Sequence, residues 1–537
     1  MVVKPASEAQ VREATEADAA EVVRVFQAAY GDAYMYPQFY QETGVKKMIF
    51  SDDTLMLVAE DEGTGEILGT ASVVLEIGAF SDLVGEFGRL VVAPEARGRG
   101  IGKKLLRGRL ERVRDRLHVG IIEARTAHPY SCMIARRHGF APVGALPNKL
   151  FFGPEREHAS LYVQHFGQAL ALRRNHPRVI PEVYRLASAA MSHVGLDVDV
   201  VVDEEAAPYA HGGDYSIEDL EADGYSSLLR IERGRVRRRE VFGPLRLHYG
   251  FFKLEATQAH YLIARSEGRV AGAVGFILDR HEKHVRIFEL IHIDEAAVRS
   301  LLTALDRRAR EDWDIATIEI DVSADAPRMQ RTLLEIGYRP ACYLPAHAFH
   351  RVERRDVVKM WRLFEAPLPC PPDLPTRASE LVDMVLASFR RQRAQPRIRE
   401  AMERMRLFSG LTEDQAAWLG ALIDYRRVDE GEELFRRGQP SDEMYLIVDG
   451  EVSIETEAAV LGTVGPGECV GEVALLAGGG HSATAVARRE LEAGVLTRVE
   501  LIELVRRRPD IGVVLYRNLA AELGDKLRRT DFADRDA

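Results

Sequence analysis

A glycine-rich turn between a strand and a helix is the segment of this sequence best equipped for chemistry. EFGRLVVA (residues 86–93) is apolar and β-branched, and Pro94 ends it. RGRGIG (residues 97–102) follows, and beyond it apolar residues recur at roughly helical spacing. Glycines let a backbone approach a ligand closely, and the first N–H groups of a helix are unpaired and favour an anion. The sequence therefore predicts a pyrophosphate-binding turn.

This turn resembles the signature R/Q-x-x-G-x-G/A of the GNAT acetyltransferase superfamily, which holds the pyrophosphate of acetyl-CoA after the fourth strand. The preceding EFGRLVVAP and the later RRHGFAPVG (136–144) also fit, so the resemblance covers roughly residues 10–152. It implies an N-acetyltransferase with acetyl-CoA as co-substrate. The cofactor-binding residues implied by the resemblance are Leu90, Val91, Val92, Arg97, Gly98, Arg99, Gly100, Ile101, Gly102, Lys103 and His128.

The reaction needs a base for the attacking amine and a donor that polarises the thioester carbonyl. Glu86 lies eleven residues before Arg97 on the same expected strand, the spacing at which protein-lysine members of the family carry their base. The resemblance thus implies Glu86 as the catalytic residue, and the alternative is a surface glutamate at the start of a strand. Many members have a tyrosine as general acid where this chain has Ala135, and Tyr130 lies nearby.

A faint internal repeat indicates a second copy of the same α/β unit. GFAPVGALP (139–147) and GYRPACYLP (337–345) share a G-aromatic-x-P start and an L-P end. Paired strand-like runs precede them, at residues 55–75 and 261–278. In the second copy the strand at 286–294 runs into a helical pattern without a glycine turn. We therefore predict a GNAT-like domain there that lacks a pyrophosphate site and is non-catalytic.

From residue 404 short strands alternate with glycine turns, a pattern typical of a small β-roll. YLIVDGEV (445–452), GECVGEVALL (467–476) and SATAVA (482–487) resemble the cyclic nucleotide-binding domain of the CAP and protein kinase A regulatory family. The resemblance implies cAMP or a related cyclic nucleotide as a regulator. The implied binding residues are Gly471, Glu472, Val473, Ala474, His481, Ser482, Ala483 and Thr484.

His481 departs from that family, in which an arginine holds the cyclic phosphate. Arginine is a permanently charged, forked donor, whereas histidine is mostly neutral at pH 7. Losing a charge-assisted hydrogen bond costs roughly 1.5–3 kcal/mol, which weakens binding by about one to two orders of magnitude. The alternatives for this pocket are a cyclic nucleotide, a different anion, or a pocket used only for contacts.

Bulk properties restrict the remaining classes of function. The chain has 537 residues, so several domains are expected, and its net charge of −11 argues against bulk nucleic-acid binding. It has no apolar run of membrane-spanning length and no signal-peptide core. Its four cysteines are far apart, so neither a disulfide framework nor a metal site is predicted. We expect a cytoplasmic protein that does not bind DNA, because no room for a helix-turn-helix follows the last module.

The expected fold is a duplicated α/β GNAT fold with a mixed central sheet, followed by a β-roll with flanking helices. The expected division is a catalytic domain (1–153), a second GNAT-like domain (154–364), a Pro-rich and helical linker (365–403), a cyclic nucleotide-binding-like domain (404–530) and a tail (531–537). The leading interpretation is an N-acetyltransferase of protein lysine modulated by the C-terminal module, similar to bacterial cyclic-nucleotide-regulated lysine acetyltransferases. The alternatives are an acyl-CoA and nucleotide sensor or scaffold without turnover, and an acetyltransferase for a small amine or a protein N-terminus.

Overall fold

The structure is a computed structural model that describes residues 8–76, 83–152, 155–220, 240–242, 259–371, 373–440, 442–456, 459–472 and 479–533. The chain forms two compact units, Met1–Leu386 and Ala387–Ala537, and each is considered by itself. No helix in these ranges is both long and apolar enough to cross a membrane.

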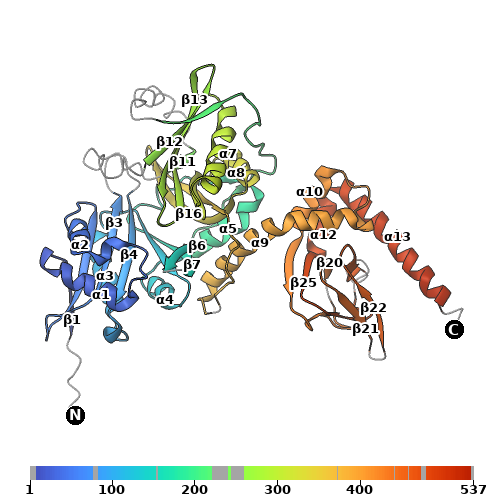
Figure 1. Ribbon diagram of the computed structural model, residues 1–537, viewed down its shortest axis with the longest axis horizontal. Coiled ribbons are helices and arrows are strands. Elements are labelled where there is room, and N and C mark those ends of the chain that lie inside the picture. The colour runs from blue at the N-terminus through green and yellow to red at the C-terminus, as the bar shows by residue number, and fades with distance from the viewer. Residues whose placement is uncertain are drawn as a thin grey trace, which may run out of the picture. The chain divides into compact units, whose positions relative to one another are not determined.

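The first half of the first unit is a mixed sheet with helices on its faces (Figure 1). Strands β4 and β5 are parallel, and all other neighbours in this half are antiparallel. The strands, in spatial order, are β1 (Ala9–Glu13), β2 (Thr54–Asp61), β3 (Ile67–Glu76), β4 (Val84–Val92), β5 (Val119–Arg125), β7 (Glu155–His165) and β6 (Ala141–Phe152). The helices are α1 (Ala19–Tyr30), α2 (Glu42–Ile49), α3 (Ile101–Val113) and α4 (Tyr130–Arg137).

Alternating side chains of strand β2 divide these helices between the two faces of the sheet. Met56 and Val58 pack in one cluster with α1 and α2, whereas Leu57 and Ala59 pack in another with α3. This separation follows from the two-residue period of a strand, which sends successive side chains to opposite faces. The sheet is therefore buried on both sides, as its nearly continuous apolar sequence predicts.

The second half repeats the order of elements found from β2 to β7. It contains β12 (Ala259–Ser266), β13 (Arg269–Asp279), β14 (His284–His292), α7 (Ala296–Glu311), β15 (Thr317–Ser323), α8 (Pro327–Ile336), β16 (Arg339–His350) and β17 (Glu353–Leu363). As in the first half, the third and fourth strands are parallel and the last two are antiparallel. The predicted strand pairs at 55–75 and 261–278 are confirmed. The short strands β10 (Ser216–Asp219) and β11 (Val241–Phe242) pair with β12 and β15.

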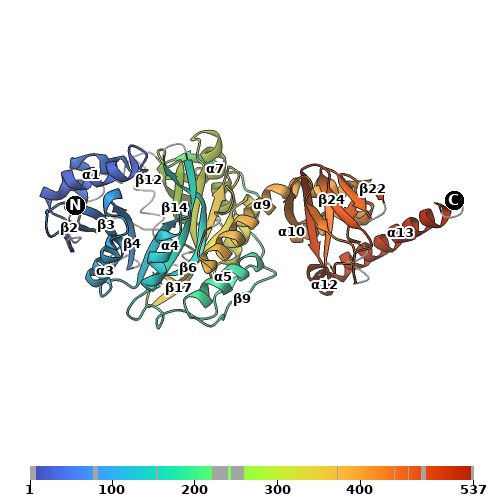
Figure 2. The same ribbon diagram turned by 90° about the horizontal axis from the view of Figure 1, so that it is seen from below.

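One continuous sheet joins the two halves, because β6 pairs with β16 where Gly144 lies opposite Cys342. A Cβ atom at Gly144 would lie 2.2 Å from the Ala341 carbonyl oxygen, so only glycine permits this close approach. Helix α5 (Pro181–His193) packs against both joined strands (Figure 2). The two halves therefore fold as one body.

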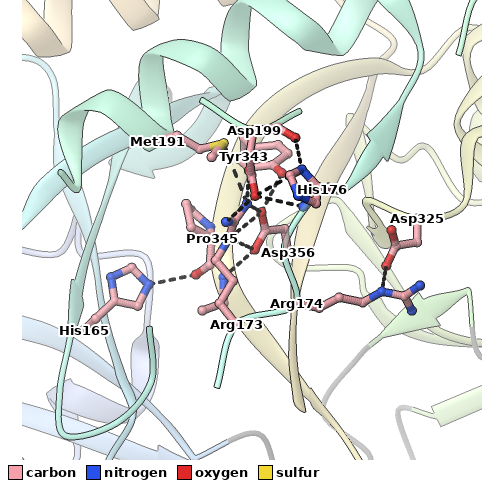
Figure 3. A network of polar contacts seen from close by, with 11 residues as sticks. His165, Arg173, Arg174, His176, Met191, Asp199, Asp325, Tyr343, Pro345 and Asp356 are labelled. Carbon is pink, nitrogen blue, oxygen red and sulfur yellow. Dashed lines mark hydrogen bonds and ion pairs between the residues drawn. The ribbon is translucent and has the colours of Figure 1, made fainter. Parts of the chain in front are cut away.

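A buried ion-pair network fixes the segment that connects the halves (Figure 3). This segment contains β8 (Arg178–Val179) and β9 (Val201–Val202). The Arg173 guanidinium lies between Asp356, at 2.7 Å, and Asp199, at 2.9 Å. Asp356 also accepts hydrogen bonds from the Tyr343 hydroxyl and the Ala346 amide. Both carboxylates hold the pKa of Arg173 above its ordinary value despite burial.

Two expected domain boundaries need correction. The boundary at residue 153 falls between β6 and β7, yet β7 pairs with both β5 and β6 and so belongs to the first half. The boundary at 404 is late, because helix α9 (Thr376–Arg404) crosses from one unit to the other. Ala394, Ile398 and Met402 of α9 lie in the core of the second unit. Both errors arise because pairing and packing are not visible in local sequence.

The second unit contains two four-stranded antiparallel sheets with helices beside them, which agrees with the predicted β-roll. One sheet contains β18 (Asp424–Val428), β25 (Leu491–Thr497), β20 (Glu443–Asp449) and β23 (Cys469–Val470). The other contains β19 (Glu433–Phe435), β24 (Thr484–Ala487), β21 (Val452–Glu455) and β22 (Val460–Val464). The helices are the end of α9, α10 (Glu413–Leu422), α12 (Arg498–Arg507) and α13 (Pro509–Ala533).

The buried network predicts a large effect of Asp356→Asn on the stability of the first unit. Losing one partner of a buried ion pair costs about 3–5 kcal/mol, since the remaining charge stays buried. Urea-dependent hydrogen exchange of peptides from β16 and β17 will measure the free energy of unfolding. Glu353→Gln is the matched control, because Glu353 forms partly exposed ion pairs with Arg174 at 3.6 Å and Arg355 at 3.0 Å, whose loss should cost under about 1 kcal/mol. Equal effects of the two substitutions would contradict this account of the network.

Candidate functional site

A cavity of about 1100 Å³ opens in the first half, where β4 and β5 diverge. These parallel strands pair only over Val84–Glu86 and Val119–Ile121, although β4 continues to Val92 and β5 to Arg125. Beyond the paired residues the two strands no longer hydrogen-bond to each other. The cavity is lined by both strands, by the turn before α3 and by α4, so it brings the predicted site residues together.

A bulge in β4 shapes the floor of this cavity. Gly88 lies opposite Ser72 and Val91 opposite Thr70, so two residues of β4 stand against one of β3. Arg89, within the bulge, has a positive φ of 54°. The buried guanidinium of Arg109, on α3, donates to the carbonyl oxygens of Gly88 and Ser72 at 3.1 and 3.0 Å. Burial lowers the pKa of Arg109 to about 9.

The predicted anion turn lies at one end of the cavity. Gly98 and Gly100 have φ values of 82° and 78°, and helix α3 begins at Ile101 without a side-chain cap. The predicted residues that line the cavity are Leu90, Val91, Val92, Arg97, Gly98, Gly100, Ile101, Gly102, Lys103 and His128. Arg99 does not line it, because its guanidinium pairs with Asp61 at 2.9 Å. The turn therefore offers mainly backbone N–H groups, together with Arg97 and Lys103.

The predicted base, Glu86, lines the same cavity. Its side chain is 45% exposed, and its carboxylate lies 3.3 Å from the Arg89 guanidinium. Burial opposes the charge of Arg89, but the Glu86 carboxylate holds the pKa of Arg89 above its ordinary value. Arg89 also lies over the ring of Tyr36. The bulge residue thus fixes the predicted base against a wall of the cavity.

Sequence reasoning missed a second carboxylate, Glu123 on β5, which also lines the cavity. Burial raises the pKa of the Glu123 carboxyl, although the charge of Lys149 opposes the shift. The segment VGIIEAR reads as an ordinary strand with two charged residues near its end, Glu123 and Arg125. Pairing Glu86 with Ile121 in parallel register would have placed Glu123 on the same face of the sheet.

Aromatic rings that the sequence did not single out form the wall beside these carboxylates. Tyr34 and Phe152 contact each other, and the Arg125 guanidinium lies 3.8 Å from the centroid of Phe152. Arg125 is also paired with Glu157, so its charge is compensated. The aromatic residues of this wall are Tyr30, Tyr34, Tyr36 and Phe152, and Phe87 and Tyr130 line the cavity elsewhere. Such a wall suits an aliphatic chain that ends in a cation.

The opposite wall, on α4, contains no tyrosine at the position expected for a general acid. Ala135 lies there and lines the cavity, while Tyr130 lines it from the start of α4 and is 67% exposed. His128 packs its ring against Tyr130, with centroids 5.4 Å apart. Burial and the charge of Arg125 lower the pKa of His128. Tyr130 and its neighbour Ser131 are the residues with hydroxyl groups through which α4 lines the cavity.

The second half fills the place that is open in the first. Strands β14 and β15 pair in parallel over His284–Ile287 and Thr317–Ile320. Further along, β11 pairs antiparallel with β15, with Phe242 opposite Asp321. Val241 and Phe242 are buried, and two residues separate β14 from the N-cap of α7, without glycine. The predicted absence of a glycine turn is thus observed, and the chain itself occupies the gap.

In the second unit, His481 presents a buried imidazole where the resembled family has an arginine. Its imidazole is buried and stacks on Phe435 with ring centroids 3.7 Å apart and planes 9° apart. Burial lowers the pKa of His481, so the ring is neutral at pH 7. Thr484 accepts a hydrogen bond from the Arg437 amide at 3.1 Å.

The other predicted residues of this pocket differ in exposure. Gly471 has a φ of 88°, Glu472 and Ala483 are buried, and Ser482 is exposed. Val473 and Ala474 lie outside the described residues. The buried glutamate is the side chain that the resemblance assigns to a ribose hydroxyl.

Comparisons with known proteins agree with this division of sites. The chain is similar to the cyclic AMP receptor protein of Thermus thermophilus, with 32% identity over 131 residues, 24% of this chain and 59% of that protein. A putative potassium channel protein of Rhodopseudomonas palustris is 35% identical over 141 residues, 24% of this chain and 34% of that protein. The chain thus spans between about a third and three fifths of the length of these curated relatives.

A solved cyclic nucleotide-binding domain from Methylobacillus flagellatus is 24% identical, covers 26% of this chain and 80% of that chain, and has a TM-score of 0.24. Two family models match separate parts of the sequence. The acetyltransferase (GNAT) domain model matches residues 52–142, and the cyclic nucleotide-binding domain model matches residues 425–508. The chain therefore contains a GNAT acetyltransferase domain in its first half and a cyclic nucleotide-binding domain in its C-terminal unit.

Proposed function

We propose that the chain is an acetyl-CoA-dependent N-acetyltransferase of protein lysine that a cyclic nucleotide modulates through the C-terminal unit. The observation that carries the proposal is the union, in one cavity, of a glycine turn at a helix N-terminus with a carboxylate base. A protein that only bound acyl-CoA would not need Glu86 held by Arg89 in this cavity. We place this activity in the cytoplasm.

Acetyl-CoA would lie in the cavity with its pyrophosphate at the glycine turn and its thioester beside Glu86. Its pyrophosphate would meet the N–H groups of residues 98–102, where the dipole of α3 favours an anion. The gap between β4 and β5 would receive the pantetheine arm, since the backbone of Leu90–Val92 lines that gap. The thioester would then lie near the bulge at Arg89 and beside Glu86. Backbone donors fixed by Arg109 would polarise its carbonyl.

The acceptor nitrogen would enter from the aromatic side. There Tyr34, Tyr36 and Phe152 would enclose an aliphatic stem, and the carboxylates would attract an ammonium group. Glu86 takes a proton from this nitrogen, which attacks the thioester carbon. The C–N bond forms, the C–S bond breaks, and sulfur leaves with the electron pair. This wall is the basis for choosing lysine over a substrate without a long aliphatic stem.

We infer that the second half is a GNAT-like domain that does not bind acetyl-CoA. Its order of elements supports a duplication of the fold, and β11 occupies the gap that acetyl-CoA would need. Its β13–β14 turn contacts the acceptor side of the first half, since the His281 ring lies 3.0 Å from the Met35 carbonyl oxygen. The second half thus supports the acceptor wall.

Helix α9 supports the proposed regulation. Ala378, near its start, lies in a core cluster of the first unit, whereas Met402, near its end, lies in the core of the second. A change in the second unit that moves this helix would reach the cluster around α4. The buried Glu472 supports binding of a ribose, and the neutral His481 predicts an affinity lower than that of an arginine-bearing pocket.

The turn predicts that Gly98→Ala will weaken acetyl-CoA binding about tenfold, measured by calorimetry. A side chain at a φ of 82° costs roughly 1–2 kcal/mol, and the new methyl group limits the approach of the pyrophosphate. Gly65→Ala is the matched control, because Gly65 has a φ of 75° in the β2–β3 turn, away from the cavity. Equal affinities of the two variants would show that the turn does not bind the anion.

Replacing the base predicts a different pattern. Glu86→Gln should reduce kcat for acetyl transfer to lysine at neutral pH by about 10²-fold or more, because the amide cannot accept the proton. The acetyl-CoA affinity should stay within about twofold, since Glu86 lies away from the anion turn. Steady-state kinetics with labelled acetyl-CoA give the first quantity and calorimetry the second. An unchanged kcat would remove Glu86 from the mechanism.

The neutral, stacked His481 predicts how cAMP affinity responds to a positive charge at this position. His481→Arg should increase cAMP affinity about tenfold or more, because a charged fork replaces a neutral ring. In the natural chain the affinity should not rise as the pH falls from 8 to 7, since the lowered pKa keeps His481 neutral. Calorimetric titrations measure both. No gain from the arginine would mean that the pocket does not present this position to a phosphate.

A further inference from the structure

Acetylation of a lysine removes two protons from its ammonium group, and one carboxylate cannot hold both of them at once. A lysine ammonium group loses two protons when it becomes an amide, the first before attack and the second as the C–N bond forms. Glu86 accounts for one of them. The cavity contains a second carboxylate, Glu123, in the gap between the same two strands.

The register of β4 and β5 places the two carboxylates on one face. Glu86 lies opposite Ile121, and Glu123 is the next residue of β5 on that face. Paired strands are about 4.8 Å apart and two residues span about 6.6 Å, so the two Cα atoms are at least roughly 8 Å apart, because the strands separate beyond Ile121. Both side chains line the cavity, so an acceptor nitrogen that enters it would meet both carboxylates. The aromatic wall leads to this point.

Glu123 has no hydrogen-bond or ion-pair partner among the residues that the structure describes. The cations that face it are each compensated by another carboxylate. Arg89, from β4, pairs with Glu86, and Lys149, from β6, lies 3.7 Å from Glu282.

The second half faces Glu123 with one cation and one carboxylate, and these are paired with each other. They are Arg286 of β14 and Glu319 of β15. Lys359 compensates Glu319 further, at 3.6 Å. Tyr36, across the cavity, remains un-ionised because burial raises its pKa. These nearby cations are therefore paired with other carboxylates, and none of them forms an ion pair with Glu123.

We propose that Glu123 is a second catalytic residue, which binds the acceptor ammonium group and takes its first proton. This inference rests on the proposed acetyltransferase function. The neutral amine then attacks the thioester carbon, the C–N bond forms, and the C–S bond breaks with the electron pair on sulfur. Glu86 takes the second proton and returns it to the thiolate, so that one proton in total leaves through Glu123.

The different environments of Glu123 and Glu86 support their assignment to two separate proton transfers. Desolvation in the cavity raises the pKa of the Glu123 carboxyl, and a carboxyl with a raised pKa is a stronger base that suits work near neutral pH. Glu86 is 45% exposed and paired with Arg89, so its environment differs. Two carboxylates in contrasting environments are the arrangement expected for two separate proton transfers.

The test uses the full chain, acetyl-CoA and a synthetic peptide with one lysine and a blocked N-terminus. Glu123→Gln should lower kcat about 10²-fold, remove the acid limb of the kcat/KM profile against pH, and leave acetyl-CoA affinity within twofold. Glu123→Asp should restore part of kcat. Glu111→Gln, on the exposed face of α3, is the control and should match the natural chain. A Glu123→Gln variant with an unchanged acid limb would overturn the proposal.

A second variant tests the electrostatic part. Glu282→Gln releases Lys149 to compensate Glu123, so the acid limb should move to lower pH, and an unmoved limb would contradict the assignment. If the natural chain does not acetylate the peptide, the proposed acetyltransferase function is contradicted, but the assignment of Glu123 as a proton acceptor is still open to test.

Infrared difference spectra of the natural chain and of Glu123→Gln then test that assignment. The inference requires a protonated-carboxyl band at mildly acidic pH that is absent from Glu123→Gln, and the lack of that band in the natural chain overturns it.

Discussion

The site depends on two parallel strands that pair for three residues and then separate. Strands that stayed paired would leave no cavity, and the backbone of β4 would be engaged in the sheet. The bulge at Arg89 and the buried Arg109 maintain the separation, because they redirect β4 and hold its carbonyl groups from α3. The cavity between the separated strands has the glycine turn at one end and the carboxylates of Glu86 and Glu123 at the other.

The two halves share the order of their strands and helices but differ at the gap between their parallel strands. In the second half the gap contains β11, and β14 leads to α7 without a glycine turn. That half contacts the first half through the joint at Gly144 and through the turn that contains His281 and Glu282, which reach Met35 and Lys149.

Local sequence predicted the elements that a local pattern specifies. The glycine turn after β4, the helical periodicity of α3 and the strand pairs of both halves were all visible in it. Features that depend on contacts between distant residues were not. The expected boundary at residue 153 separates β6 from β7, because the sequence of neither strand alone shows that the two strands pair.

The candidate site shows the same limit. The resemblance predicts Glu86 as the base from its spacing to the turn, whereas Glu123 is recognised as its neighbour only when the register between the two strands is known. Arg99 matched a signature by position, yet its side chain pairs with Asp61. His481 was identified as a departure by type, whereas its stacking on Phe435 is a fact of packing.

The measurement that tests the central claim most directly is the stoichiometry of acetyl-CoA binding to the full chain by isothermal titration calorimetry. The open gap of the first half and the filled gap of the second predict one site per chain. Two sites would contradict the role assigned to β11. The absence of binding would contradict the glycine turn and, with it, the acetyltransferase.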